Sequence, residues 1–194
     1  MAAIFAKIVL PVVISIGGEE VFIRPLVPVL YSSSSLMPFL PKAYAGMLAI
    51  NCIGSALTLI TLGGKVGAAR RKAIEEAKKD GDDPNAEDRY SYPKMYAEGF
   101  SKSAKLFNCI QRGHQHALET YTPFVIMSLI GAIRYPVSSA LGGLLWIVAR
   151  FAWADGYATG DPNNRYSSLW SVGVWTSLVF QLFASIGVIY HFVK

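Results

Sequence analysis

The sequence predicts an all-α integral membrane protein, in which a four-helix transmembrane bundle follows an N-terminal extension. Of its 194 residues, 53% are hydrophobic and only 16% are charged, and the mean hydropathy is +0.36. A soluble domain of this size carries about a quarter charged residues. Several apolar runs also approach or exceed the roughly 20 residues that a helix needs to cross a bilayer. These observations exclude an ordinary soluble domain.

Four spanning helices are expected, at about 43–69, 104–134, 138–159 and 166–192. The first and the last contain apolar runs of full spanning length without any Lys, Arg, Asp or Glu. The two middle runs are slightly short, and they reach spanning length when the polar residues at the helix ends are included. The four helices form a membrane domain over residues 43–194, with membrane lipids around it.

The N-terminal extension, residues 1–42, is apolar, and its second part, GGEEVFIRPLVPVLYSSSSLMPFLPK, is interrupted by prolines. These are Pro25, Pro28, Pro38 and Pro41. Each proline removes a backbone donor and clashes with the preceding turn, so a continuous helix cannot run through them all. We expect a short helix followed by irregular chain that contacts a partner or lies at the membrane surface. The first residues, AAIFAKIVLPVVISIGG, also resemble a targeting signal.

The connection between the first two spans is strongly basic. Eleven of the 18 Lys and Arg residues lie between Lys65 and Arg112, so the positive-inside tendency places this connection in the cytosol or its equivalent. The stretch KVGAARRKAIEEAKK continues the first helix beyond the membrane, because it is rich in helix formers. The following DGDDPNAEDRYSYPKMYAEG is expected to be a loop. Because topology explains the net charge of +5, no nucleic-acid partner is expected.

Polar residues follow one face of the second span. Arg112, His116 and Glu119 are separated by four and three residues, a spacing that places side chains on one side of a helix. Charged groups at membrane depth are costly unless they are paired or face a cavity, so they mark a functional site by default. The alternative is structural: Arg112 and Glu119 form a ladder with His116 that only supports the helix.

The third span repeats this arrangement with Arg150, Trp153 and Tyr157. Two polar stripes on different helices indicate one crevice between the helices, opening near the basic side. The structural alternatives are that Arg150 extends to the lipid headgroups and that the two aromatic residues belong to the belt at the membrane surface.

A metal site is not expected. Four potential ligands gather near the start of the second span: Cys109, His114, His116 and Glu119. His114 and His116 are two residues apart and therefore point to different faces of the helix, so one helix cannot bring both to the same ion. Cys52 and Cys109 are interpreted as structural thiols.

Three segments resemble the family of membrane-associated proteins in eicosanoid and glutathione metabolism (MAPEG), most closely its microsomal glutathione transferase type 3 branch. They are FNCIQRGHQHALETYTPF, GLLWIVARFAWADGYATGDPNNR, and AARRK at the end of the first span. The resemblance covers about residues 43–192. It implies a four-helix membrane bundle, assembled as a homotrimer, with glutathione bound between neighbouring subunits.

The resemblance also implies roles for individual residues. Glutathione carries two carboxylates and an ammonium, which call for arginine forks and a glutamate. The residues implied to hold it are Arg70 or Arg71, Arg112, Glu119 and Tyr157. Arg165 matches the family's thiol-activating position and would be the catalytic residue, because a guanidinium near the sulfur favours the thiolate.

Two functions are compatible with this pattern. The first is a glutathione-dependent transferase or peroxidase that acts on lipophilic electrophiles or lipid hydroperoxides, with glutathione as co-substrate. The second is a non-catalytic subunit of a larger membrane complex, present in one copy among other membrane chains. The first predicts a homotrimer, whereas the second predicts helix faces covered by other subunits.

Two positions of the implied substrate pocket separate these functions. The family usually has asparagine where this chain has His116, and tyrosine where it has Trp153, and both changes favour the non-catalytic subunit. The enzyme is favoured by four residues that match the family: Arg112, Glu119, Tyr157 and Arg165. The endoplasmic reticulum is the family's default location, and a mitochondrial or plastid membrane is the alternative if the N-terminal residues act as an address.

Overall fold

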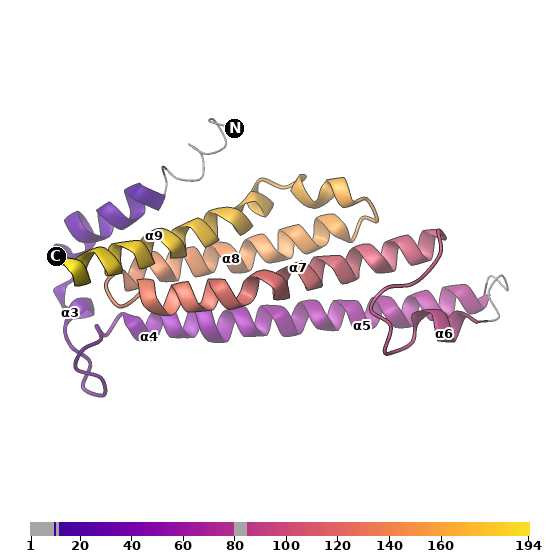
Figure 1. The fold of residues 1–194 in the computed structure, drawn as a ribbon, viewed down its shortest axis with the longest axis horizontal. Coiled ribbons are helices and arrows are strands. Elements are labelled where there is room, and N and C mark those ends of the chain that lie inside the picture. The colour runs from indigo at the N-terminus through magenta and orange to yellow at the C-terminus, as the bar shows by residue number, and fades with distance from the viewer. Residues whose placement is uncertain (1–9, 11, 80–84) are drawn as a thin grey trace.

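The computed structural model describes residues 10, 12–79 and 85–194 and shows a bundle of long helices lying side by side (Figure 1). The first long helix is continuous and consists of α4 (Tyr44–Met47), a π-helical stretch η2 (Leu48–Gly54) and α5 (Ser55–Lys79). The other three are α7 (Lys102–Gly131), α8 (Pro136–Tyr157) and α9 (Gly173–Val193). The predicted all-α class is confirmed.

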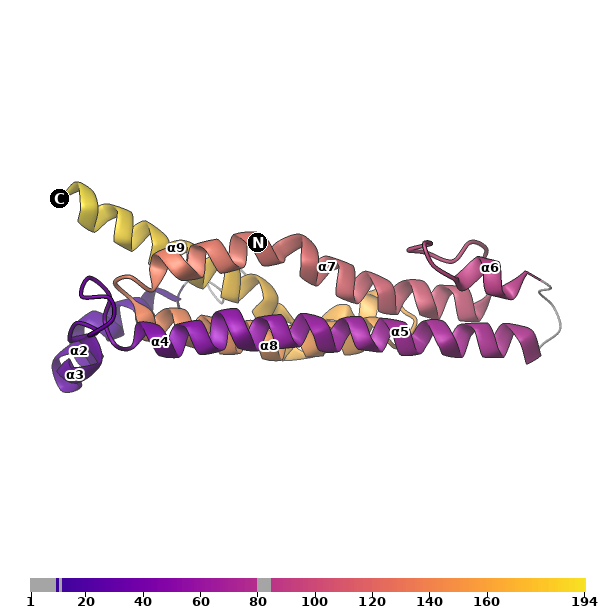
Figure 2. The same cartoon turned by 90° about the horizontal axis from the view of Figure 1, so that it is seen from below.

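Among the residues that the structure describes, three helices are long and apolar enough to cross a membrane, namely Tyr44–Lys79, Pro136–Tyr157 and Leu169–Val193. They identify an integral membrane protein, as predicted. The fourth long helix, α7, has 30 residues but carries polar and ionisable groups through its first half. Figure 2 shows that α7 lies along the same bundle as the three apolar helices.

Two connections differ from the prediction. The α-helix of the last span begins at Gly173, because the preceding residues form the short 3-10 turns η3 (Pro162–Tyr166) and η4 (Leu169–Val172). The predicted loop after α5 contains a short helix, α6 (Ala86–Tyr90), held to α5 by an ion pair of 2.8 Å between Lys78 and Glu87. The hydrogen bond from Lys78 lowers the pKa of the exposed Glu87 carboxyl. As predicted, the first helix itself continues through the basic stretch to Lys79.

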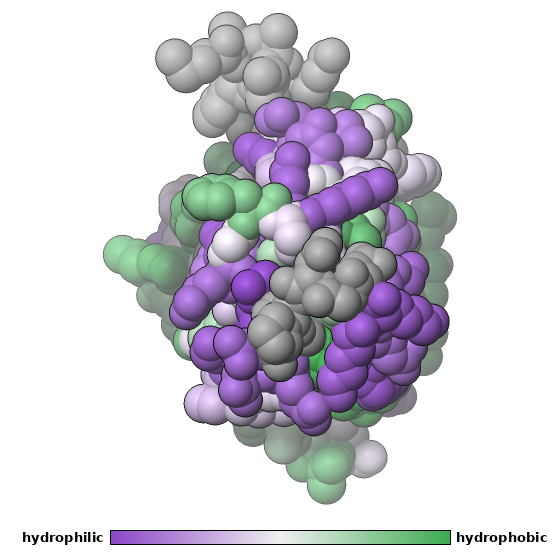
Figure 3. All heavy atoms as spheres, turned by 90° about the vertical axis from the view of Figure 1, so that its right-hand side faces the viewer, coloured by the Kyte–Doolittle hydropathy of each residue, from purple (hydrophilic) through white to green (hydrophobic). Residues whose placement is uncertain are grey.

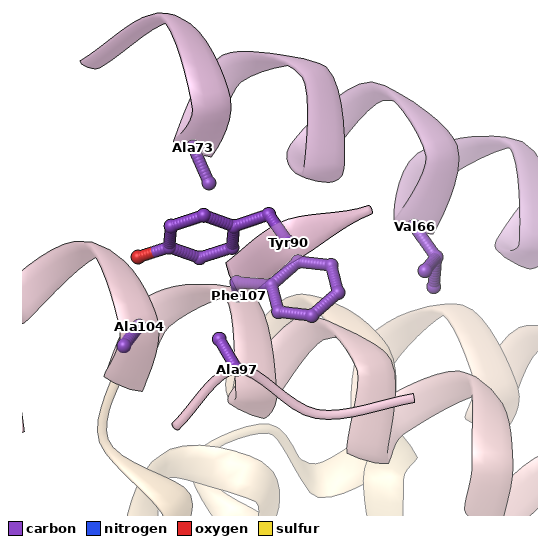
Figure 4. Packing of buried hydrophobic residues seen from close by; sticks show 6 residues of the cluster. All are labelled: Val66, Ala73, Tyr90, Ala97, Ala104 and Phe107. Carbon is purple, nitrogen blue, oxygen red and sulfur yellow. The ribbon is translucent and has the colours of Figure 1, made fainter. Parts of the chain in front are cut away.

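The connection folds back onto the end of the bundle. Tyr90 and Phe107 meet edge to face, with ring centroids 5.8 Å apart and an interplanar angle of 88°. Figure 4 shows small side chains of α5, α7 and the connection gathered around these two rings. The buried members of this cluster are Val66, Ala73, Tyr90, Ala97, Ala104 and Phe107. This packing positions the segment that borders the candidate site.

Nearer the other end of the bundle, buried polar side chains join the four long helices. Asn51 donates to the hydroxyl of Ser128 at 3.0 Å and to the carbonyl of Ser139 at 2.8 Å, and Gln181 donates to the same carbonyl at 2.9 Å. Interhelical hydrogen bonds of this kind and close approach at small residues stabilise membrane bundles. Gly143 allows the approach here, since a methyl group at that position would overlap the Asn51 side chain.

The N-terminal extension is helical over residues 12–26 and includes a π-helical stretch, η1 (Glu19–Ile23), and α2 (Arg24–Leu26). The helix breaks at Val27, one residue before Pro28, and a single turn α3 (Pro28–Tyr31) follows. The chain then reaches α4 through an irregular segment with one bridge between Ser33 and Pro41. The first part of the stretch that resembles a targeting signal lies outside the described residues.

Candidate functional site

A cavity of about 430 Å³ lies between the first connection, the first half of α7 and the end of α8. Its lining residues are Tyr96, Gly99, Phe100, Lys105, Asn108, Cys109, Arg112, Tyr157 and Pro162. Figure 3 looks onto the end of the molecule formed by α5, α6 and the connection and shows mostly hydrophilic surface there. Because residues of the basic connection line the cavity, it lies toward this end of the bundle, the side on which the sequence predicted a polar crevice to open.

Residues of α7 reach this cavity because of their spacing. Lys105, Asn108 and Arg112 are separated by three and four residues and so lie on one helix face. Sequence reasoning identified Arg112 and Tyr157 and missed Lys105 and Asn108. The signal that could have found them is the same helical period, extended by two turns toward the start of α7.

The outer wall of the cavity is the connecting segment, which is pinned to two helices. The Asn108 amide forms two hydrogen bonds with Ala97, accepting from its N–H at 2.8 Å and donating to its carbonyl at 2.9 Å. From α5, the buried guanidinium of Arg70 donates to the carbonyls of Tyr90 and, at 3.0 Å, Lys94. These bonds hold the segment in the position that closes the cavity on one side.

Replacing Asn108 with alanine is expected to loosen this wall. Each lost hydrogen bond contributes about 1 kcal/mol, so hydrogen exchange of the Ala97 amide should accelerate by about tenfold or more. Asn108→Asp is the matched control, because its carboxylate still accepts from the Ala97 N–H but cannot donate to the carbonyl, and exchange should rise less. Unchanged exchange in Asn108→Ala would show that other contacts hold the segment.

Arg70 and Arg71 take different positions, although they are adjacent in the sequence. The Arg70 guanidinium lies over the rings of Tyr92 and Phe107, at 4.3 and 4.8 Å from the ring centroids, so its role in this structure is to support the wall. Arg71 is exposed on the outside of α5. Neither residue lines the cavity. Of the two, only Arg71 has an exposed side chain that a ligand can reach.

Arg112 and Glu119 form an ion pair on the surface of α7. Their side chains are separated by two helical turns, and Nη1 of Arg112 donates to the Glu119 carboxylate at 2.5 Å. Both side chains are partly exposed, so a ligand can compete for the guanidinium. The Glu119 carboxylate can in turn bind a positively charged group of a ligand near Arg112.

The two polar stripes predicted for α7 and α8 meet. Arg150 is only 1% exposed, and its guanidinium donates to Nδ1 of His116 at 2.9 Å and to the hydroxyl of Thr120. The His116 ring stacks on Trp153 with centroids 4.8 Å apart and an interplanar angle of 15°. The alternative in which Arg150 extends to the headgroups is therefore wrong, because this side chain is enclosed between two helices.

Arg165 lies beside Tyr157, at the edge of the cavity. It belongs to η3, where it donates to the carbonyl of Pro162 at 2.6 Å. Its guanidinium is 5.0 Å from the ring centroid of Tyr166 and 6.0 Å from that of Tyr157. Arg165 does not line the cavity itself, but it lies close to Tyr157, which does.

The charges of the site suit an anionic ligand. Lys105 and Arg112 line the cavity, Arg165 flanks it, and the described part of the lining contains no carboxylate. The remaining surface comes largely from aromatic and small side chains, which can contact an apolar group. Within the described ranges, no three His, Cys, Asp or Glu side chains gather as metal ligands.

Comparison with known families agrees with this architecture. The MAPEG family matches residues 48–186, a range that includes the predicted site residues from Arg70 to Arg165. The match leaves out the N-terminal extension and the end of α9. Because it spans well over half of the chain, the protein belongs to the MAPEG family, whose fold is a four-helix membrane bundle.

Proposed function

We propose that this protein is a glutathione-dependent membrane transferase or peroxidase of the microsomal glutathione transferase type 3 branch. The observation that carries the proposal is the cavity lined by Arg112, Lys105 and Tyr157, with Arg165 beside Tyr157. Family membership supports it, because the MAPEG family includes glutathione-dependent transferases and peroxidases. The acceptor is a lipophilic electrophile or a lipid hydroperoxide that reaches the site from the bilayer.

The site residues match the chemistry of glutathione. The tripeptide has two carboxylates and one ammonium, so it carries a net negative charge that Arg112 and Lys105 attract. Arginine forks bind carboxylates in a bidentate manner, and Glu119 is placed to receive the ammonium. Arg71 is the further guanidinium available from α5, contributed by the same subunit or, in a homotrimer, by a neighbouring one.

Arg165 is proposed to activate the sulfur. A free thiol with a pKa of about 8.5 is only a few per cent ionised at neutral pH, and a nearby guanidinium stabilises the thiolate. In the transferase reaction, the thiolate forms a C–S bond while the leaving group departs with the electron pair. In the peroxidase reaction, it attacks the hydroperoxide, the O–O bond breaks to release an alcohol, and a second glutathione converts the sulfenic acid to disulfide and water.

The non-catalytic subunit is the second candidate. It is favoured by the packing of the His116 cluster, which consists of His116, Trp153 and Arg150. His116 and Trp153 stack against each other and are held by Arg150, so their rings fill space between α7 and α8. Such a protein would keep the bundle without binding glutathione. It would occur in one copy within a larger membrane complex, whereas the enzyme would be a homotrimer in the endoplasmic reticulum membrane.

Arg112→Ala tests the enzyme proposal by glutathione binding. Loss of a charge-assisted hydrogen bond costs about 2–3 kcal/mol, so the affinity measured by calorimetry in detergent should fall by about 30- to 150-fold. Arg112→Lys keeps the positive charge but cannot form two parallel hydrogen bonds with a carboxylate. Its affinity for glutathione should therefore lie between those of Arg112→Ala and the unmodified protein. Lys102→Ala, which removes an exposed charge at the start of α7, should bind as the unmodified protein does.

The result also decides between the two candidates. Folded protein that binds no glutathione at millimolar concentration would contradict the enzyme and leave the structural subunit. Binding that persists in Arg112→Ala would place glutathione away from this cavity.

A further inference from the structure

The N-terminal extension is anchored to the bundle by a buried carboxylate. Glu19 is fully buried, and its carboxylate accepts hydrogen bonds from the N–H groups of Val137 at 3.1 Å and Ser138 at 2.6 Å. These residues belong to the first turn of α8, whose N–H groups have no acceptor within the helix. The hydroxyl of Tyr31 donates to the same carboxylate at 2.7 Å. Glu19 thus caps α8 from a distant part of the chain.

The other two charges of residues 12–41 also point toward the bundle. Glu20 lies 3.4 Å from Arg24 and 3.0 Å from Arg134, which follows the end of α7. The Arg24 guanidinium donates to the carbonyl of Arg134 at 2.6 Å. Every ionised side chain in this part of the extension is therefore paired inward.

The outward face of the extension is apolar. Ile14 is 63% exposed and Phe22 is 65% exposed. The other large apolar residues on this surface are Val13, Val21, Leu26 and Val29. In water, a helix turns its charges outward and its apolar side chains inward, and large exposed apolar patches mark contacts. The observed arrangement is the reverse of that of a solvated segment.

The helix lies along α9 and not beyond its end. Ile16 packs against a buried cluster of Tyr135, Ala184 and Val188, of which the last two belong to α9. Ala184 and Val188 come nine and five residues before Val193, the last residue of α9. A helix rises about 1.5 Å per residue, so this contact lies about 8–14 Å from that end of a membrane-spanning helix.

We propose that residues 12–30 form a fifth membrane-embedded element whose outward face contacts lipid acyl chains. The exposed side chains of α9, among them Leu182, Ile186 and Ile189, form an apolar surface at the same level. Where α9 crosses the hydrocarbon, the extension that packs against it lies at the same depth. Charged groups are costly at this depth unless paired, which accounts for the inward pairing of Glu19, Glu20 and Arg24. This inference is independent of the proposed function.

Single cysteines in nanodiscs test the proposal, with Cys52→Ser and Cys109→Ser as the background of the full chain. Phosphatidylcholine nanodiscs leave both membrane faces open to a water-soluble maleimide. Ile14→Cys and Phe22→Cys are expected to escape labelling, as does Ile60→Cys on α5, which is 70% exposed. Glu98→Cys, in the connection, should label rapidly. All variants must label after unfolding in detergent.

Quenching by lipid distinguishes acyl chains from protein as the cover. A fluorophore attached to Ile14→Cys or Phe22→Cys should be quenched by spin-labelled acyl chains, whereas one at the fully buried Val12 should not. Labelling of Ile14→Cys and Phe22→Cys as fast as that of Glu98→Cys would place the face in water and overturn the proposal. Protection without quenching would also overturn it, because a second copy of the chain would then cover the face.

Discussion

Replacing Gly156 with alanine is expected to remove Arg165 from the site and reduce the rate of thiol transfer by about 100-fold, since small displacements of catalytic groups have effects of this size. A methyl group on Gly156 would collide with the carbonyl oxygen of Asn164 and lie 2.8 Å from Cα of Arg165. Both are backbone atoms, so neither can rotate away as a side chain would. The turn η3 must lift off the end of α8.

The measurement separates thiolate formation from binding. Thiolate absorbance of bound glutathione should be lost in Gly156→Ala, while the affinity, which depends on Arg112, should fall much less. Gly67→Ala on α5 is the matched control, because no heavy atom lies within 4 Å of the place that its added methyl group would take. It should leave activity unchanged and stability equal or slightly higher. Normal thiolate formation in Gly156→Ala would exclude Arg165 as the activating cation.

Local periodicity was sufficient to predict the bundle and part of the site. The uncharged runs identified the first and last spans, and the helical spacing within each stripe placed Arg112 near Glu119 and Arg150 near Trp153. The two stripes also predicted one crevice between their helices. Arg112 and Tyr157 line the cavity, whereas His116 and Arg150 meet directly. The structure shows this meeting as the bond between Arg150 and His116.

The remaining features depend on contacts between distant parts of the chain. Nothing in the local sequence distinguishes Arg70 from Arg71, yet one is buried against the connection and the other is exposed. The pairing of Asn108 with Ala97 requires the connection to fold back, which loop composition does not reveal. The capping of α8 by Glu19 joins residues more than one hundred positions apart.

Arg150→Ala is expected to destabilise the protein more than any other single truncation of a polar side chain in the bundle. The guanidinium bonds to His116 and Thr120 and lies 4.9 Å from the ring centroid of Trp146, so it joins α8 to α7. Loss of two bonds to a charged group, together with the cavity left behind, costs about 3 kcal/mol. The midpoint of thermal unfolding in detergent should fall by roughly 6–12 °C.

The same variant decides whether Arg150 supports the fold or binds a ligand. Arg71→Ala removes an exposed guanidinium and should leave the unfolding midpoint unchanged. Arg150→Lys keeps the charge but cannot reach both partners with one ammonium, so its midpoint should lie between those of Arg150→Ala and the unmodified protein. An unchanged midpoint in Arg150→Ala, combined with weaker glutathione binding, would contradict the structural role. The buried guanidinium would then belong to the binding site, with the His116 cluster as its inner wall.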